Sequence, residues 1–122
     1  MAHESPPDFH KKHRGLHKCG IGLPVRGLLQ LLIIKSLSQK PMRGIDIKNT
    51  IKDRFGFEIP SAVIYMVLKG LEERGFVYST WDKISEGNPI KVYTITSEGK
   101  EYLEERVKAL HSIRKIVDFL IE

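Results

Sequence analysis

The chain has 122 residues, of which 41% are hydrophobic and 29% charged, and this balance is typical of one globular domain. Its single cysteine excludes an intramolecular disulfide, and its longest apolar run, residues 27–34, is far shorter than the ~20 residues that cross a bilayer. The N-terminus also lacks the apolar segment of a secretory signal. We therefore expect a cytoplasmic protein with no membrane partner.

The net charge of +5 is concentrated near the N-terminus, where residues 1–43 hold eight of the 20 basic residues but only two of the 15 acidic ones. Such a bias favours a polyanionic partner, because Lys and Arg contacts to phosphates release counterions. A solvated basic segment without any partner is the alternative.

Residues 1–22 combine Pro, Gly, His and Lys without apolar periodicity, which predicts a flexible basic arm. Within it, His10, His13, His17 and Cys19 are residue types that bind zinc, nickel or copper. Their spacing matches no structural zinc motif, so we assign no metal and no cofactor. Two alternatives stay open: the arm lies along DNA, or it makes the protein a metal-responsive regulator whose DNA affinity changes when a chelator is added.

Three helices are predicted after the arm. Pro24 can open the first, over residues 24–38. The second covers 43–55, and the third begins at Pro60 and stops at Gly75. Each carries apolar residues at helical spacing. These are Leu28, Leu31, Leu32 and Leu37 in the first, Ile47, Ile51 and Phe55 in the second, and Ile64, Val67, Leu68 and Leu71 in the third.

A hairpin and a long helix complete the chain. Residues 76–81 and 90–95 are rich in β-branched and aromatic residues, and Gly, Asn and Pro lie between them. Thr96 can cap a final helix over residues 97–121, which at ~1.5 Å per residue is longer than the domain needs. Apolar residues recur along it at about heptad spacing, which predicts a dimer interface. They are Leu103, Leu110, Ile113, Val117 and Leu120. Packing on the first helix of the same chain is the alternative.

The order of elements predicts a mainly α (α+β) fold: a winged helix-turn-helix domain over residues 23–96, with a two-stranded wing, and a dimerisation helix over 97–122. In such a domain the third helix can enter the DNA major groove. Candidate DNA contacts are Ser61, Ala62, Tyr65 and Lys69 on that helix, Lys83 and Lys91 in the wing, and Arg43 and Lys48 near the start of the second helix. The alternatives are a half-buried tyrosine and solvated lysines.

Three separated segments resemble the PadR family of transcriptional regulators. Residues 60–77, PSAVIYMVLKGLEERGFV, are similar to its recognition helix. Residues 43–47, RGIDI, resemble the opening of its second helix, although Ile45 replaces the usual aromatic residue. Residues 92–99, VYTITSEG, resemble its wing strand leading into the last helix. The resemblance covers about residues 24–120.

The resemblance implies a homodimer that binds double-stranded DNA at a pseudo-palindromic operator and represses transcription, with a small-molecule effector of unknown chemistry. The chief alternative is a winged-helix module for protein–protein interaction, which would share the fold. We expect no enzymatic activity, because the sequence holds no nucleophile and base pair, phosphate loop or paired carboxylates on a plausible cleft.

Overall fold

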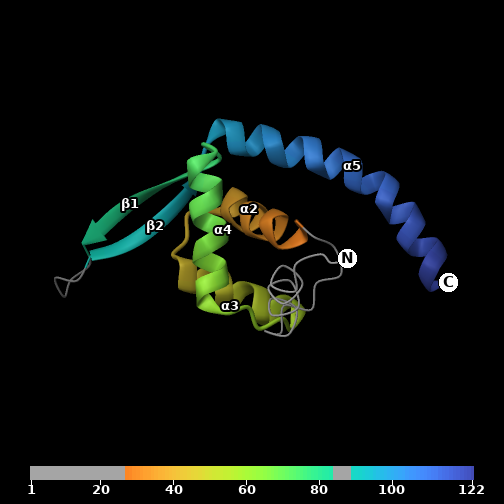
Figure 1. The fold of residues 1–122 in the computed structure, drawn as a ribbon, viewed down its shortest axis with the longest axis horizontal. Coiled ribbons are helices and arrows are strands. Elements are labelled where there is room, and N and C mark those ends of the chain that lie inside the picture. The colour runs from red at the N-terminus through yellow and green to blue at the C-terminus, as the bar shows by residue number, and fades with distance from the viewer. Residues whose placement is uncertain (1–26, 84–88) are drawn as a thin grey trace, which may run out of the picture.

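A computed structural model describes residues 27–83 and 89–122. Figure 1 shows helices α2 (Leu28–Gln39), α3 (Gly44–Phe55) and α4 (Ser61–Glu73) grouped together. The hairpin of β1 (Val77–Lys83) and β2 (Pro89–Ile95) projects to one side, and α5 (Ser97–Ile121) passes α2 and extends beyond it. The predicted fold class, a mainly helical winged helix-turn-helix with a two-stranded wing, is confirmed. The predicted arm, residues 1–22, lies outside the described residues.

One hydrophobic core joins the helices and the base of the wing. Its fully buried side chains are Ile33, Ile34, Leu37, Ile47, Ile51, Ile59, Ile64, Leu68 and Leu71. The predicted apolar stripe of α4 is therefore confirmed. Phe55 was predicted on the buried stripe of α3, and this is wrong: its side chain is exposed. The reason is that α3 ends at Phe55, where the Arg54 guanidinium lies 5.6 Å from the ring centroid.

Gly75 follows the end of α4, and Thr96 caps the start of α5. The predicted stop at Gly75 is confirmed, because Gly75 has φ +81° and its N–H donates to the carbonyl of Glu72. The predicted cap at Thr96 is also confirmed, since its hydroxyl accepts from the N–H of Gly99 at 3.0 Å. Pro60 precedes the first turn of α4 instead of lying in it, with an extended ψ of 143°.

The wing is attached to the helices by backbone hydrogen bonds that the sequence pattern did not predict. The strands pair antiparallel from Val77 opposite Ile95 to Lys83 opposite Pro89, slightly longer than predicted. Met42, between α2 and α3, then forms a bridge with Tyr93: the two residues exchange N–H to carbonyl bonds of 3.1 and 2.8 Å. The connection between α2 and α3 therefore acts as a short third strand beside β2.

Within the described residues, helix α5 packs on the domain mainly through its beginning. Leu103 is 9% exposed and belongs to the core. Beyond it, residues 104–122 are exposed except for the half-buried Leu110. Among the described residues, no helix combines the length and the apolar character needed to cross a membrane.

We predict that Leu68→Ala lowers the free energy of unfolding by about 2–5 kcal/mol, because it leaves a cavity in the center of the core. Urea unfolding followed by circular dichroism measures this. The matched control is Met66→Ala on the same helix, where the side chain is 57% exposed and the change should stay within about 0.5 kcal/mol. Equal losses for the two variants would contradict the described packing of α4.

Candidate nucleic-acid interface

The side of α4 that faces away from the core is exposed. Val63, Ile64, Leu68 and Leu71 occupy the buried side. Helical spacing therefore turns the predicted contact residues outward, and each of them is exposed: Ser61, Ala62, Tyr65 and Lys69. Met66 is also exposed on this helix, although it is not among the predicted contact residues. Its position off the Ile64–Leu68–Leu71 stripe could have identified it.

Tyr65 connects α4 to the start of α3. Its side chain is 45% exposed, and its ring lies against the backbone of the buried Gly44. A Cβ placed on Gly44 would be 2.5 Å from Cε1 and 2.7 Å from the hydroxyl oxygen of Tyr65. The structure thus brings together two residues that lie 21 positions apart in the sequence.

Arg43 precedes the first turn of α3 and is held there by Asp46. Its Nε and one terminal nitrogen each donate to the Asp46 carboxylate at 2.9 Å, and its backbone N–H donates at 3.3 Å. These hydrogen bonds raise the pKa of the Arg43 guanidinium and lower the pKa of the Asp46 carboxyl. The carboxylate also stabilises the positive N-terminus of α3. Arg43 therefore has a defined position beside Gly44.

The remaining predicted basic residues differ from one another in their surroundings. Lys48, on α3, is half-buried. Lys91, on β2, places its Nζ 5.6 Å from the ring centroids of both Trp81 and Tyr93, so the wing holds this cation against two aromatic faces. Lys83 ends β1, and its side chain lies outside the described part of the structure.

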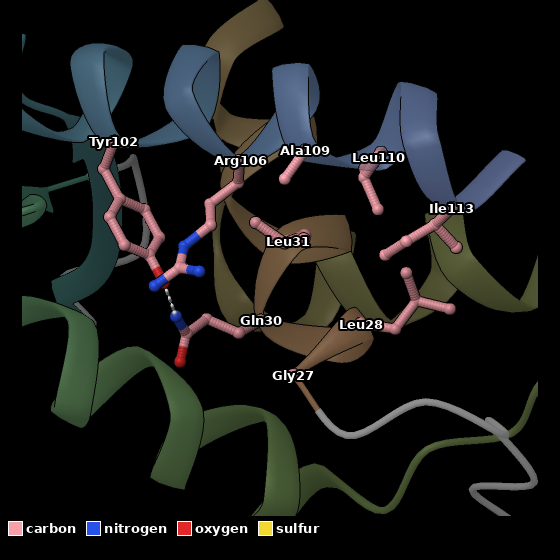
Figure 2. A pocket seen from close by; sticks show the side chains of 9 residues that line it. All are labelled: Gly27, Leu28, Gln30, Leu31, Tyr102, Arg106, Ala109, Leu110 and Ile113. Atoms are coloured by element: carbon pink, nitrogen blue, oxygen red, sulfur yellow. Dashed lines mark hydrogen bonds between the residues drawn. The ribbon is translucent and has the colours of Figure 1, made fainter.

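An open cavity of about 330 Å³ lies between the start of α2 and the middle of α5 (Figure 2). Leu28 and Leu31 line it from α2, and Leu110 and Ile113 line it from α5. At one end the Gln30 side chain donates to the Tyr102 hydroxyl at 2.8 Å. Two of the residues predicted at the dimer interface therefore border a gap between helices of one chain.

The five residues predicted at the dimer interface fall into two groups. Ile113, Val117 and Leu120 are 41%, 44% and 71% exposed, and Leu110 is half-buried. Leu103 differs from its predicted place, because it packs in the core of its own chain. The reason is that α5 runs beside α2 at this point before it leaves the domain.

Metal ligands are not grouped within residues 27–83 and 89–122, where no three His, Cys, Asp or Glu side chains could hold one ion. The ligand types considered in the sequence analysis, His10, His13, His17 and Cys19, lie outside the described residues.

We predict that the Arg43–Asp46 pair makes a pH-dependent contribution to stability. The folded-state pKa of Asp46 is lowered, so this contribution is present above the unfolded pKa of about 3.9 and is lost as pH falls through the folded pKa. Because the pair is exposed, Asp46→Asn should cost less than about 1 kcal/mol at pH 7. In urea unfolding, this cost should shrink as the pH falls below the unfolded pKa of about 3.9.

The control for charge is Asp53→Asn, which removes one acidic group from the same helix outside the Arg43 pair. A cost of Asp46→Asn that does not change between neutral and acidic pH would contradict the assignment.

Comparisons with known proteins agree with this arrangement. The profile of the transcriptional regulator PadR-like family matches residues 33–105. An uncharacterized protein of Lysinibacillus sphaericus is 33% identical over 100 residues, which cover 80% of this chain and 92% of that protein. The sequence similarity therefore extends over all of α3, α4 and the wing.

Solved structures share the fold at comparable identity. A predicted transcriptional regulator of Thermoplasma acidophilum is 38% identical with a TM-score of 0.73, covering 78% of this chain and 91% of that one. A PadR family regulator of Clostridium difficile is 27% identical with a TM-score of 0.71, covering 79% and 100%.

A third structure, Bacillus subtilis PadR in complex with operator DNA, is 27% identical with a TM-score of 0.61. It covers 66% of this chain and 47% of that one. Because the family profile matches more than half of this chain, the chain belongs to the PadR-like family of transcriptional regulators.

Proposed function

We propose that the protein is a sequence-specific DNA-binding regulator that acts as a homodimer on a pseudo-palindromic operator and represses transcription. The observation that carries this proposal is the exposed side of α4, where Ser61, Ala62, Tyr65 and Lys69 lie in an otherwise well-packed helix. The B. subtilis relative in complex with operator DNA supports it.

The exposed side of α4 suits the major groove. A groove about 12 Å wide admits one helix, and residues at the start of that helix come nearest to the base edges. Ser61 and Ala62 occupy this start, and Ser61 offers a hydroxyl donor and acceptor. Tyr65 and Lys69 follow one and two turns later, where a phenol and an ammonium group can bind phosphates. The helix thus combines groups for base contact with groups for backbone contact.

The flanking basic residues would extend the phosphate contacts. Arg43 and Lys48 lie at the start and in the middle of α3, the helix that crosses the backbone in this class of domain. Lys83 and Lys91 belong to the wing, which would lie along the neighbouring backbone. Each contact would add a salt-dependent increment to affinity.

We predict that the protein binds the duplex upstream of its own gene more tightly than a scrambled duplex, and that Lys69→Ala weakens binding by about tenfold for each of the two charged hydrogen bonds that the dimer loses. Because a dimer carries two such lysines, the slope of log affinity against log salt should fall by about two. Fluorescence anisotropy at about 50 and 200 mM salt measures both quantities.

The matched control is Lys100→Ala, which removes an exposed lysine from α5 and should leave affinity unchanged. Equal weak binding of both duplexes, or no binding, would contradict sequence-specific recognition and favour the protein-interaction alternative. Repeating the titration with zinc and then with a chelator tests the metal-responsive alternative, because only that alternative predicts that tight DNA binding depends on the ion.

The homodimer is proposed from the apolar surface of α5. Residues 104–122 contain exposed Ile113, Ile116, Val117, Phe119 and Leu120. A helix segment in water is stabilised mainly by packing of its apolar face, and the described part of its own domain leaves α5 exposed beyond the half-buried Leu110. A second copy offers an identical face, so a two-fold arrangement covers both faces at once. It would also set the spacing of two α4 helices over paired half-sites.

Light scattering at tens of micromolar should therefore give the mass of a dimer, and Val117→Asp should give a monomer, because it places a charge in the apolar contact. The monomer should bind operator much more weakly, since it contacts one half-site. His111→Asp is the control with the same change in formal charge, because helical spacing places the exposed His111 on the side of α5 opposite Ile113 and Leu120. A wild-type monomer would overturn both the interface and the paired half-site arrangement.

Repression follows if the dimer covers the promoter until an effector alters the spacing of its two α4 helices. A reporter gene behind the bound duplex tests the sign: loss of Lys69 should raise expression for a repressor and lower it for an activator.

A further inference from the structure

The contact between Gly44 and Tyr65 is closer than a larger residue at position 44 would allow. Carbon atoms in van der Waals contact are about 3.5–4.0 Å apart. A Cβ on residue 44 would lie 2.5, 2.6 and 2.7 Å from Cε1, Cζ and the hydroxyl oxygen of Tyr65. The phenol ring therefore occupies the space that any other side chain at this position would need.

The backbone conformation of Gly44 does not require glycine. Positive φ angles in the described residues occur at Gly27, Gly56 and Gly75, and Gly44 is not among them. It is the first residue of α3, where alanine is a better helix former than glycine. Local structure therefore gives no reason for glycine here, and the ring of Tyr65 supplies one.

The ring, not the fold, would give way if residue 44 gained a Cβ. The three atoms nearest to the added carbon all belong to the far end of the Tyr65 side chain. That side chain is 45% exposed and lies on the outer side of α4, so rotation about its side-chain bonds can carry the hydroxyl into solvent. The added Cβ would therefore displace the Tyr65 hydroxyl and leave the fold unchanged.

We propose that Gly44 is a positioning residue for DNA binding: because it lacks a Cβ, it lets the phenol of Tyr65 lie against the start of α3 and holds the hydroxyl where a DNA phosphate is bound. This inference rests on the proposed DNA-binding function. Arg43 immediately precedes Gly44 and is held by Asp46, so it would present its positive charge beside the same phosphate.

The test compares Gly44→Ala, Tyr65→Phe and the double variant by anisotropy on the operator duplex. Tyr65→Phe removes the hydroxyl and should weaken binding about fivefold to tenfold for each of the two hydrogen bonds that the dimer loses. Gly44→Ala should weaken binding to a similar extent. The double variant should be no weaker than the stronger of the two single effects, because both act on one contact.

The control is Gly70→Ala, in α4, where an added Cβ meets no atom within 4 Å and affinity should be unchanged. Thermal unfolding separates positioning from structure: Gly44→Ala should keep or raise the melting temperature, because alanine favours the helix. If it lowers the melting temperature instead, adding Tyr65→Ala should restore it. Failure to restore it would show that the clash lies elsewhere and would overturn the inference.

A readout without DNA tests the positioning directly. NMR spectra of protein labelled at the tyrosine rings show signals from the four tyrosines. Those of Tyr65 are identified by their loss in Tyr65→Phe. Gly44→Ala should shift these signals, and Gly70→Ala should not. Unchanged Tyr65 signals, or wild-type affinity for Gly44→Ala beside a weakened Tyr65→Phe, would overturn the role of Gly44 and leave the DNA-binding proposal intact. Absence of operator binding by the wild type would instead overturn both.

Discussion

The rest of the structure depends on the burial of one side of α4. Ile64, Leu68 and Leu71 are fully buried in one core that also contains residues of α2 and α3, such as Ile33 and Ile47. Each such side chain contributes about 1.5–3 kcal/mol when it leaves water, so the helix has one strongly preferred rotation about its axis. That rotation turns Ser61, Ala62, Tyr65 and Lys69 outward. The core therefore orients the candidate DNA-binding surface.

The end of α4, the start of the wing and the start of α5 meet at one aromatic pair. Phe76 and Tyr102 stack with centroids 4.4 Å apart, and the Arg74 guanidinium lies 4.9 and 5.2 Å from the two centroids. Tyr102 also accepts a hydrogen bond from Gln30 of α2. The helix proposed to form the dimer is thus packed directly against the exit of the helix proposed to contact DNA. In the proposed dimer, this cluster would lie between α5 and α4 in each copy.

Several positions show why a pattern along the chain is incomplete. Phe55 continues the four-residue spacing of Ile47 and Ile51, but it stands at the end of α3 and is exposed. Leu103 continues the spacing of Leu110 and Val117, but α5 is still beside α2 there, so its side chain enters the core. Periodicity identifies the apolar face of a helix, whereas the packing of neighbouring elements decides which residues of that face are buried. The same limit explains why the bridge between Met42 and Tyr93 was missed.

By itself, the sequence determined the order of elements, the buried stripe of α4, the stop at Gly75 and the cap at Thr96. These are consequences of local periodicity, backbone freedom and capping chemistry, which act over a few residues. Only the tertiary structure decided that the Tyr65 ring lies on Gly44, that Lys91 rests between two aromatic rings and that Leu103 is internal. These contacts join separate elements, and their geometry depends on how the helices and the wing pack together.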